Sequence, residues 1–320
     1  MKEAAVVIPN WNGMKYIGKC LDSLRAQSCS CFQVYVIDNG STDGSRDLVE
    51  EFYPEVSLHC FSENTGFCRA VNEGIRVSSE PYVILLNNDT AADPHMVEEL
   101  LRAIRRRPKA FSCQAKMLSM AHPDLVDDAG DAYCALGWAY AMGRGKPAGK
   151  IRRDRRIFAS CGGAAIYRRS VLDEIGLFDE RHFAYLEDID IGYRAALFGY
   201  GSYLASKAVV LHAGSGASGS KYNAFKVRHS ARNSVYLVRK NMPLLQRLLN
   251  LPFLMAGFGI KMIFFFRKGH GKDYVSALQK GLTMPVGEQK VRFSFSRLPH
   301  YVRVQLALWK YMILRFGEKA

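Results

Sequence analysis

The chain has 320 residues, of which 48% are apolar and 23% charged, a composition that predicts a folded core and excludes disordered and fibrous classes. Its net charge of +14 is unevenly distributed, because residues 226–320 hold 18 Lys and Arg against only Asp273, Glu288 and Glu318. Residues 1–225 are therefore close to neutral, and the sequence divides into a near-neutral body and a basic C-terminal part.

The eight cysteines show neither paired zinc-ligand spacing nor a Cys-x-x-Cys motif, and most of them lie among apolar residues. This pattern predicts buried free thiols in a reducing compartment. The opening Met1-Lys2-Glu3 leads directly into an apolar run, without the pattern of a signal peptide. We therefore expect a cytosolic protein.

Residues 4–106 alternate apolar, β-branched runs with helical patterns. Strands are predicted at 4–8, 32–37, 56–61 and 82–86, and the helices that follow them at 16–27, 46–52, 69–77 and 93–106. The last helix is expected to have Asp93 at its cap and Pro94 at its first position. Four such units predict a doubly wound, mostly parallel sheet, in which ligands bind at the carboxyl ends of the strands.

The loops at those strand ends are polar and acidic, and contain Pro9, Asn10, Asp38, Asp43, Asn64, Gly66 and Asp89. Neither Gly-x-Gly-x-x-Gly nor a Walker Gly-Lys-Ser/Thr motif occurs, which argues against the common dinucleotide and P-loop sites. A phosphate beside Asp89 would require a divalent cation, and oxygen ligands suit Mg²⁺ or Mn²⁺. For Asp43 a turn-capping role is nearly as well supported as a functional one, whereas the position of Asp89 after a wholly apolar strand favours function.

Residues 183–194 are the strongest candidate for the chemistry, because Glu187, Asp188 and Asp190 fall within four positions after an apolar, aromatic run. A helical pattern follows over 191–198 and ends at Gly199. Acidic side chains at a helix start complement its dipole, which explains Asp190 and partly explains Glu187. A crowded pair of carboxylates beside apolar residues would instead raise one pKa and create a general base.

Residues 244–266 are apolar and aromatic, and basic residues flank them. Arg247, Asn250 and Lys261 interrupt this stretch, so no run of about 18–20 apolar residues remains and a membrane span is not expected. A helix lying in the interface of an anionic bilayer is narrowly favoured over a helical subdomain or an oligomer contact.

Four segments occur in a characteristic order and spacing: Val-Val-Ile-Pro-Asn-Trp-Asn-Gly, Val-Ile-Asp-Asn-Gly-Ser-Thr-Asp-Gly-Ser, Asn-Thr-Gly-Phe-x-x-Ala-x-Asn-x-Gly and Leu-Leu-Asn-Asn-Asp-Thr. Together they resemble family 2 glycosyltransferases, most closely the bacterial rhamnosyltransferase-like branch. The likeness covers about residues 4–235 and continues through 161–165, 176–180, Glu187-Asp188, and His212 with Ser215 and Ser218. It implies a GT-A fold, a nucleotide-sugar donor, usually a divalent metal, and inversion at the anomeric carbon.

The resemblance assigns the donor-binding roles by position. A pyrimidine base would be framed by Pro9, Asn10 and Asp38, and closed in by Asn64 and Gly66. Asn87 and Asn88 would also contact the donor. Asn87 stands where the family's Asp-x-Asp motif has its first acid, so one ligand charge is lost and a lower metal affinity is expected.

The same resemblance assigns the metal and the chemistry. Asp89 would hold a divalent cation, Mg²⁺ or Mn²⁺, on the donor diphosphate, with His212 as a second ligand. Without the resemblance, a strand-end histidine bonded to backbone would be preferred for His212. Asp188 would deprotonate the acceptor hydroxyl, and Glu187 would orient or tune it.

The middle of the chain is expected to serve the acceptor side, through loops at 126–130 and 141–150. The basic run Arg152–Arg156 is either a solvated face, which is the commoner case, or a surface that receives an anionic acceptor. The small residues 162–165 predict a tightly packed segment beneath the donor sugar.

The sequence thus predicts an α/β protein with a GT-A (Rossmann-like), mostly parallel sheet flanked by helices over 1–235, and a basic, mainly helical extension over 236–320. The expected activity is inverting transfer from a pyrimidine nucleotide sugar, dTDP-L-rhamnose first, to a lipid-linked or membrane-presented glycan. An anionic membrane surface and a homo-oligomer are the further expected partners, with the protein peripheral on the inner face of the cell membrane.

Two other functions fit the sequence less well. A nucleotidyltransferase would need a glycine-rich, basic loop after the first strand, which Pro9-Asn10-Trp11-Asn12 lacks. A nucleic-acid-binding protein would need basic residues interleaved with stacking aromatics or a known motif, and none is evident, so nucleic acid is not an expected partner.

Overall fold

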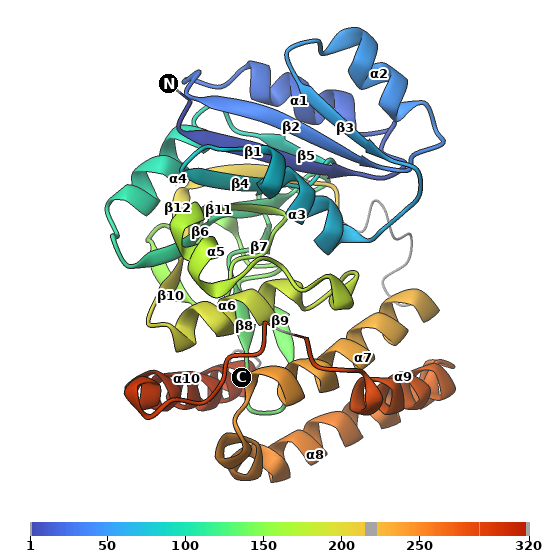
Figure 1. The fold of residues 1–320 in the computed structure, drawn as a ribbon, viewed down its shortest axis with the longest axis vertical. Coiled ribbons are helices and arrows are strands. Elements are labelled where there is room, and N and C mark those ends of the chain that lie inside the picture. The colour runs from blue at the N-terminus through green and yellow to red at the C-terminus, as the bar shows by residue number, and fades with distance from the viewer. Residues whose placement is uncertain (1, 215–222, 288, 318–320) are drawn as a thin grey trace.

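The structure, a computed structural model, describes residues 2–214, 223–287 and 289–317, and is built on a mixed ten-stranded sheet (Figure 1). The strands lie in the order β10-β12-β6-β11-β4-β1-β2-β3, with β5 paired to β12 and β7 to β6, while β8 and β9 form a separate pair. Their bounds are β1 Ala4–Asn10, β2 Phe32–Asn39, β3 Ser57–Phe61, β4 Tyr82–Leu86, β5 Thr90–Ala92, β6 Ala110–Ser119, β7 Val126–Asp128, β8 Asp131–Tyr133, β9 Ala139–Ala141, β10 Arg155–Ile157, β11 Ala164–Arg168 and β12 Gly201–His212.

The strands β1, β2, β3 and β4 run parallel, as the four strand-loop-helix units predict. The apolar, β-branched runs of β1, β2 and β4 are largely buried because helices cover both faces of the sheet, whereas the edge strand β3 is partly exposed. The register pairs Asn10 of β1 with Asp38 of β2, so the polar ends of these two strands lie side by side. The predicted α/β fold is confirmed, and the candidate loops gather at one edge of the sheet.

The second half of the sheet brings a distant segment to that edge. Strand β12 pairs in parallel with β6, and its end pairs antiparallel with the short strand β5. This pairing sets Thr90 opposite His212, although 122 positions separate them in the sequence. The register therefore brings Asp89 and His212 into one neighbourhood.

Helices of the body cover the two faces of the sheet in two sets. One set comprises α1 Ile17–Arg25, α2 Ser45–Phe52 and α4 Met96–Arg105, and the other comprises α3 Phe67–Val77, α5 Arg169–Ile175 and α6 Glu187–Leu197. Two 3₁₀ turns, η1 Ala148–Lys150 and η2 Glu180–His182, lie in the connecting segments. Each longer helix buries one apolar stripe; in α4, for example, Met96, Leu100 and Ile104 repeat at four-residue intervals and are fully buried.

The predicted start of α4 is wrong by two residues. The helix begins at Met96, and the Asp93 carboxylate instead accepts a hydrogen bond from the His95 amide, which closes the preceding turn. Strand β5 extends to Ala92, so Asp93 and Pro94 are used to leave the sheet before the helix begins. Asp93 and Pro94 therefore mark the turn before the helix rather than its cap and its first position.

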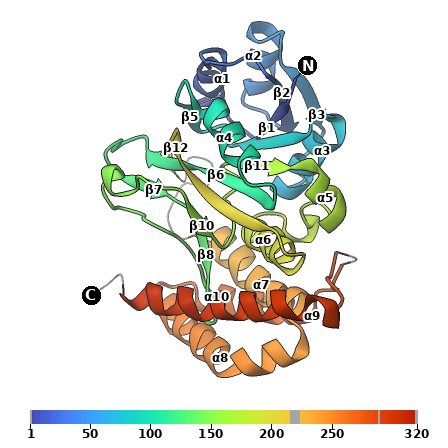
Figure 2. The same cartoon turned by 90° about the vertical axis from the view of Figure 1, so that its left-hand side faces the viewer.

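The C-terminal helices form a layer at one end of the molecule, seen from two directions in Figures 1 and 2. They are α7 Ala224–Asn241, α8 Leu244–Arg267, α9 Gly271–Thr283 and α10 Leu298–Gly317, with the 3₁₀ turn η3 Phe295–Arg297 before the last. Leu237 of α7, Leu254 of α8 and Leu308 of α10 share one buried cluster with Ile189 and Tyr193 of α6. The helical extension predicted from the sequence is present, and α7 runs without a break through the expected boundary at residue 235.

Helix α8 corrects the expectation that its polar residues leave no stretch long enough to cross a membrane. Among the described residues it is one helix of 24 residues that is long and apolar enough to do so by length and composition. The buried residues of α8 include Gln246, Asn250, Leu254 and Gly257, which repeat at helical spacing on one face. Because Asn250 is on that inner face, the outward face is more apolar than the sequence suggested.

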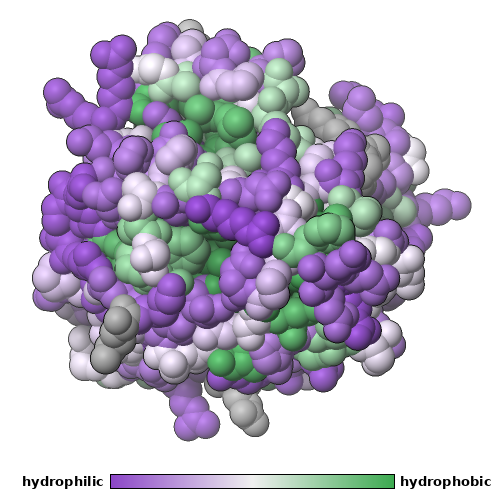
Figure 3. All heavy atoms as spheres, turned by 90° about the horizontal axis from the view of Figure 1, so that it is seen from above, coloured by the Kyte–Doolittle hydropathy of each residue, from purple (hydrophilic) through white to green (hydrophobic). Residues whose placement is uncertain are grey.

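The two ends of the molecule differ in surface character. Of the 25 large apolar side chains that are exposed among the described residues, 21 lie between Leu244 and Phe316. Seen from the end away from the C-terminal helices, the surface is largely hydrophilic, with apolar areas separated by polar ones (Figure 3). The exposed apolar surface is therefore concentrated on the C-terminal layer, where it needs a physical explanation.

Candidate active site

A cavity of about 630 Å³ opens at the carboxyl edge of the sheet. Elements from both halves of the chain line it, and its main lining residues are Pro9, Asn10, Trp11, Asn64, Gly66, Asn87, Asn88, Asp89, Asp128, Asp131, Tyr140, Arg144, Glu187, Asp188 and His212. All but one of the predicted site residues are in this set. The segments expected on the acceptor side, around β7 and β9, also contribute to its wall.

Asp38 is the exception, because it is not among the residues that line the cavity, and its predicted role beside the donor base stays a prediction. Its side chain is buried behind Asn10, whose amide nitrogen donates to Asp38 Oδ2 at 2.9 Å and to Ser45 Oγ at 2.9 Å. Asn88 then donates to Asn10 Oδ1 at 2.7 Å. Asp38 thus fixes the orientation of Asn10, and Asn10 fixes Asn88, so the carboxylate acts on the cavity through two amides.

Asp43 stays out of the cavity and closes a turn. Its carboxylate accepts hydrogen bonds from the Met14 and Ser45 amides and from the Ser45 hydroxyl. Burial alone would raise the pKa of Asp43, but these hydrogen bonds lower it below its ordinary value. Of the two roles considered for Asp43, the geometry matches the turn-capping one.

Asn64 and Gly66 form a tight turn at the cavity wall. Asn64 Oδ1 accepts hydrogen bonds from the Asn39 side chain at 3.1 Å and from the Gly66 amide at 2.9 Å. Gly66 has φ +90°, and a Cβ at this position would come within 2.6 Å of the Phe183 ring. Only glycine therefore combines this backbone conformation with such close contact to the segment that precedes α6.

Asp89 and His212 face each other in the cavity. His212 Nε2 lies 3.3 Å from Asp89 Oδ1, and His212 Nδ1 lies 2.7 Å from Asp127 Oδ2. Burial alone would lower the pKa of His212, but the hydrogen bonds to Asp127 and Asp89 raise it to about 9. The prediction identified the pair Asp89–His212, whereas Asp127, 85 residues from His212 in the sequence, was not foreseen as its partner.

The donor set at Asp89 and His212 fits a divalent cation. Two cis ligands of an octahedral Mg²⁺, each about 2.1 Å from the ion, are about 3 Å apart, close to the observed separation of these two atoms. Asp127 holds Nδ1, which leaves Nε2 directed at Asp89 in the arrangement typical of metal-binding histidines. A second candidate group, Asp128, Asp131 and Cys161, has its possible ligand atoms within 4.8 Å of one another.

Glu187 and Asp188 begin α6 and enter the cavity as a pair. Asp188 Oδ1 accepts a hydrogen bond from the Gly162 amide at 3.0 Å. Burial, followed by the negative charges of Glu187 and Asp131, raises the pKa of Asp188 well above its ordinary value. Glu187 is 7% exposed and its Oε2 has no hydrogen-bond partner among the described residues. A raised pKa beside a cavity is the property expected of a general base.

Asp190, in contrast, is part of a buried ion network that faces away from the cavity. It contacts Arg194 Nε at 3.0 Å, Lys240 Nζ at 2.9 Å and the Asn241 amide nitrogen at 2.8 Å. Burial alone would raise the pKa of Asp190, but Lys240 and Arg194 hold it well below the ordinary value. The third carboxylate of the stretch is structural, and it ties α6 to α7.

The segment immediately before Glu187 has an unusual backbone that α7 holds in place. Phe183, Tyr185 and Leu186 all have φ between 62° and 71°, a region costly for residues with a side chain. The amide nitrogen of Asn233 lies 3.0, 2.9 and 2.7 Å from the carbonyl oxygens of His182, Ala184 and Tyr185. Asn233 thus satisfies the carbonyl groups of a strained turn that aims Glu187 and Asp188 into the cavity.

Sequence reasoning missed Asn233 and Asp131 as contributors to this site. Asp131 lines the cavity, and burial together with Asp128 raises its pKa well above the ordinary value. Its signal was present in the acidic stretch that ends at Asp131, whereas nothing local to Asn233 marks it. Ser215 and Ser218, which the family likeness included, lie outside the described residues.

Comparison with known proteins gives a family match over more than half of the chain. The family model described as "Glycosyl transferase family 2" matches residues 5–176. A curated relative, the N-acetylglucosaminyl-diphospho-decaprenol L-rhamnosyltransferase of Mycobacterium tuberculosis, is 27% identical over 263 residues. That alignment covers 74% of this chain and 84% of the relative.

Two solved structures with a similar fold contain a nucleotide or nucleotide sugar together with Mn²⁺. GalNAc-T7 with UDP, GalNAc and Mn²⁺ matches with a TM-score of 0.59 at 14% identity, covering 75% of this chain and 48% of that one. The mannosyltransferase PcManGT from Pyrobaculum calidifontis, in complex with GDP-Man and Mn²⁺, matches with a TM-score of 0.55 at 14% identity, covering 95% and 87%. At such identities the likeness shows the fold alone, and it agrees with the predicted GT-A fold.

Proposed function

Because this chain belongs to glycosyl transferase family 2, we propose that it transfers L-rhamnose from dTDP-L-rhamnose to a lipid-linked saccharide at a membrane surface, with inversion. The observation that carries the proposal is the single cavity in which Asp89, His212 and the pair Glu187–Asp188 meet. The choice of sugar and acceptor is supported by the name of the mycobacterial relative, whose length this chain largely spans.

The donor side of the cavity would consist of neutral amides at the end of β1 and in the loops that follow β3 and β4. Asn10, Asn64 and Asn87 would hydrogen-bond the base and ribose, because amides both donate and accept without adding charge near the diphosphate. The chain of hydrogen bonds from Asp38 through Asn10 to Asn88 holds these groups before the donor arrives. Such preorganisation reduces the entropy that binding must overcome.

A divalent cation would be held by Asp89 and His212, with Asp127 orienting the imidazole. When bound, such a cation neutralises charge that develops on the leaving diphosphate. Asp89 is 6% exposed, so its carboxylate is shielded from bulk water, where its attraction for a cation would be weakened.

Asp188 is proposed as the base that takes the proton from the acceptor hydroxyl. The Gly162 amide fixes one of its oxygens, and the other remains available for the proton. Glu187 and Asp131 repel the ionised form of Asp188, which makes it a stronger proton acceptor once it is deprotonated. Nucleophilic attack from the side of Asp188, opposite the diphosphate, accounts for the proposed inversion.

Membrane docking would bring a lipid-linked acceptor to this cavity. Helix α8 packs one face on the body through Leu254 and Gly257 and presents the opposite, apolar face outward. A helix with this arrangement suits the interface of a bilayer, and the basic charge of the C-terminal part favours an anionic surface. Crossing the membrane would instead require Gln246 and Asn250 to give up their hydrogen bonds with Gln305.

The proposal is tested by a transfer assay with the full chain, a panel of nucleotide sugars and a polyprenyl-diphosphate-linked N-acetylglucosamine acceptor. We expect transfer from dTDP-L-rhamnose well above that from UDP- and GDP-sugars, with opposite anomeric configurations in donor and product by NMR. Retention of configuration would contradict the role of Asp188. If the chain transferred a sugar only from another nucleotide sugar, the proposed donor would be wrong, but the proposed mechanism would stand.

A further inference from the structure

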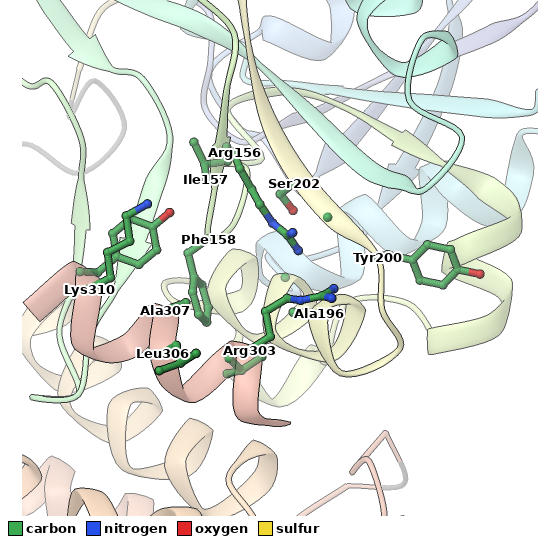
Figure 4. A pocket seen from close by; sticks show the side chains of 14 residues that line it. Arg156, Ile157, Phe158, Ala196, Tyr200, Ser202, Arg303, Leu306, Ala307 and Lys310 are labelled. Carbon is green, nitrogen blue, oxygen red and sulfur yellow. The ribbon is translucent and has the colours of Figure 1, made fainter. Parts of the chain in front are cut away.

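A second cavity, here called the basic pocket, lies between β10, β12, α6 and α10 and has a volume of about 240 Å³. Arg156 of β10 and Arg303 of α10 line it, together with Lys310 further along α10. Figure 4 shows both guanidinium groups directed into the space between β12 and α10. This pocket uses no residue of the candidate active site.

The basic pocket has positive charge that the protein does not neutralise. Among the described residues, no ion pair involves Arg156, Arg303 or Lys310. One carboxylate bonds to a lining residue: Glu174 accepts a hydrogen bond from the Tyr200 hydroxyl at 2.6 Å. In Figure 4 that hydroxyl points away from the two guanidinium groups. Two unpaired arginines in one pocket are the groups that recognise a phosphate.

The surroundings add to this positive field. Burial lowers the pKa of His300, on the same helix as Arg303, and the charges of Arg303, Arg297 and Lys109 lower it further. A histidine whose charged form is disfavoured by three neighbouring cations indicates a local excess of positive charge. An anion that enters the pocket would relieve that repulsion.

The rest of the pocket is apolar and continues onto an exposed apolar stripe. Its lining includes Phe158, Ala307 and Leu306, of which Leu306 is 57% exposed. On α10, Val302 and Ile313 lie on the same side as Leu306, and both are more than half exposed. Arg303 and Lys310 flank this stripe, where the headgroups would lie if the stripe entered a bilayer.

We propose that the basic pocket binds the phosphate of an anionic membrane lipid, with Arg156 and Arg303 on the phosphate oxygens and the acyl chains along the stripe of α10. This inference rests on the proposed docking of the C-terminal layer to a membrane, and adds to it a defined site for one headgroup. A free phosphate would use the two arginines but gain nothing from Leu306 and its neighbours, so the apolar flank favours the lipid over the ion.

The experiment compares two double variants of the full chain that lose the same charge. Arg156→Gln/Arg303→Gln removes the pocket cations, and Arg46→Gln/Arg106→Gln removes two exposed arginines of the body. Vesicle flotation is measured on phosphatidylcholine with phosphatidylglycerol, and on phosphatidylcholine with oleate at matched surface charge. We expect the pocket variant to lose about tenfold to thirtyfold in affinity for the phosphatidylglycerol vesicles, and the body variant less than about threefold. Unchanged thermal unfolding would show that both variants are folded.

Soluble ligands separate this inference from the docking proposal. Calorimetry with short-chain phosphatidylglycerol below its micelle concentration should give binding that the pocket variant loses, even if the wild-type chain ignores vesicles. Inorganic phosphate that binds as tightly as the short-chain lipid would contradict a lipid site. Equal losses on oleate and phosphatidylglycerol vesicles would also contradict it, since the pocket would then contribute charge alone. If the pocket variant bound vesicles as tightly as the wild-type chain, the proposed lipid site would be wrong, whereas the proposed docking to a membrane would stand.

Discussion

The body and the C-terminal layer differ in the sign of the charge that they concentrate and in where they place it. The body is near neutral overall yet gathers Asp89, Asp128, Asp131 and the pair Glu187–Asp188 in one cavity, where burial raises the pKa of Asp188 and Asp131. The C-terminal layer is strongly basic and leaves its apolar side chains exposed. The first arrangement suits chemistry on a substrate held away from water, and the second suits contact with an anionic, apolar surface.

The two regions are nevertheless not independent. Lys240 and Asn241 of α7 contact Asp190 of α6, and Leu237 and Leu308 share a core with that helix. Removing the C-terminal helices would therefore expose part of the body's core, so surface substitutions test the layer more cleanly than truncation does. Substitutions in the body and in the layer should therefore have distinguishable effects, the largest of them on turnover.

The largest effect is expected in the body, at the proposed base. Asp188→Asn keeps the size of the side chain but removes its ability to accept the proton, so turnover should fall by roughly 10²–10⁴-fold. Affinity for dTDP-L-rhamnose should change little, because the donor-side amides are untouched. Glu187→Gln is the matched comparison and should cost less. Turnover near that of the wild type in Asp188→Asn would remove this residue from the mechanism.

The next effect tests how firmly the layer is tied to the body. Lys240→Met leaves the buried carboxylates of Asp179 and Asp190 without their shared cation, which should cost about 3–5 kcal/mol of unfolding free energy. Lys272→Met, at an exposed position of α9, is the control and should be close to neutral. Urea denaturation measures both variants.

The pH dependence of that difference is fixed by the lowered pKa of Asp190. A carboxylate whose folded pKa is depressed contributes stability above its unfolded pKa of about 3.9, and loses it as the pH falls through the lower, folded value. The gap between wild type and Lys240→Met should therefore be full near neutral pH and shrink in acid. A gap that is constant down to the acid unfolding region would mean that packing, not charge, is lost.

Asn233 tests whether the layer also shapes the chemistry. Asn233→Ala removes the donor that holds the strained turn before Glu187, so kcat should fall by about tenfold to a hundredfold through misplacement of the carboxylates. The KM for the donor should stay nearly constant. Ser234→Ala removes a buried hydroxyl that bonds within the same helix, and should leave kcat unchanged. A loss of stability in Asn233→Ala with unaltered kcat in the folded protein would assign it a purely structural role.

These contacts also mark the limit of what the sequence predicts. Strands β1 to β4 and the ends at Asn10 and Asp89 follow from local apolar runs, so they were predicted within a few residues. The partner of Asp89 comes from β12, and Asn233, which holds the turn before Glu187, comes from α7; their approach depends on the register of the sheet and on packing, which no local pattern encodes. One local pattern does indicate packing: Asn250 and Lys261 fall at helical spacing with Leu254 and Gly257, which predicts that they face inward.

A smaller effect concerns the cation that is proposed to bind in the body. His212 must lose its proton before Nε2 can bind a metal, and its pKa is raised to about 9. Mn²⁺ affinity should therefore rise by about tenfold per pH unit as the pH increases toward that value, and level off above it. In His212→Gln this slope should flatten, and Asp89→Ala should weaken Mn²⁺ binding at every pH. Affinity independent of pH in the wild type would exclude His212 as a ligand.

The smallest effects are expected in the C-terminal layer, where two substitutions distinguish the electrostatic from the apolar contribution to membrane docking. Arg267→Gln at the end of α8 should reduce binding to anionic vesicles by about fivefold at low ionic strength, the share of one basic residue near a charged surface. That loss should vanish at about 1 M salt, where the screening length falls to roughly 3 Å. Ile263→Ser, at an apolar position of the same helix that is 55% exposed, should weaken binding equally at both salt concentrations, because apolar insertion is not screened. If neither variant affects vesicle binding while Ile263→Ser lowers the solution mass, the exposed face of α8 is an interface between copies of the chain. The contrast between body and layer would then be one of assembly rather than of location at a membrane.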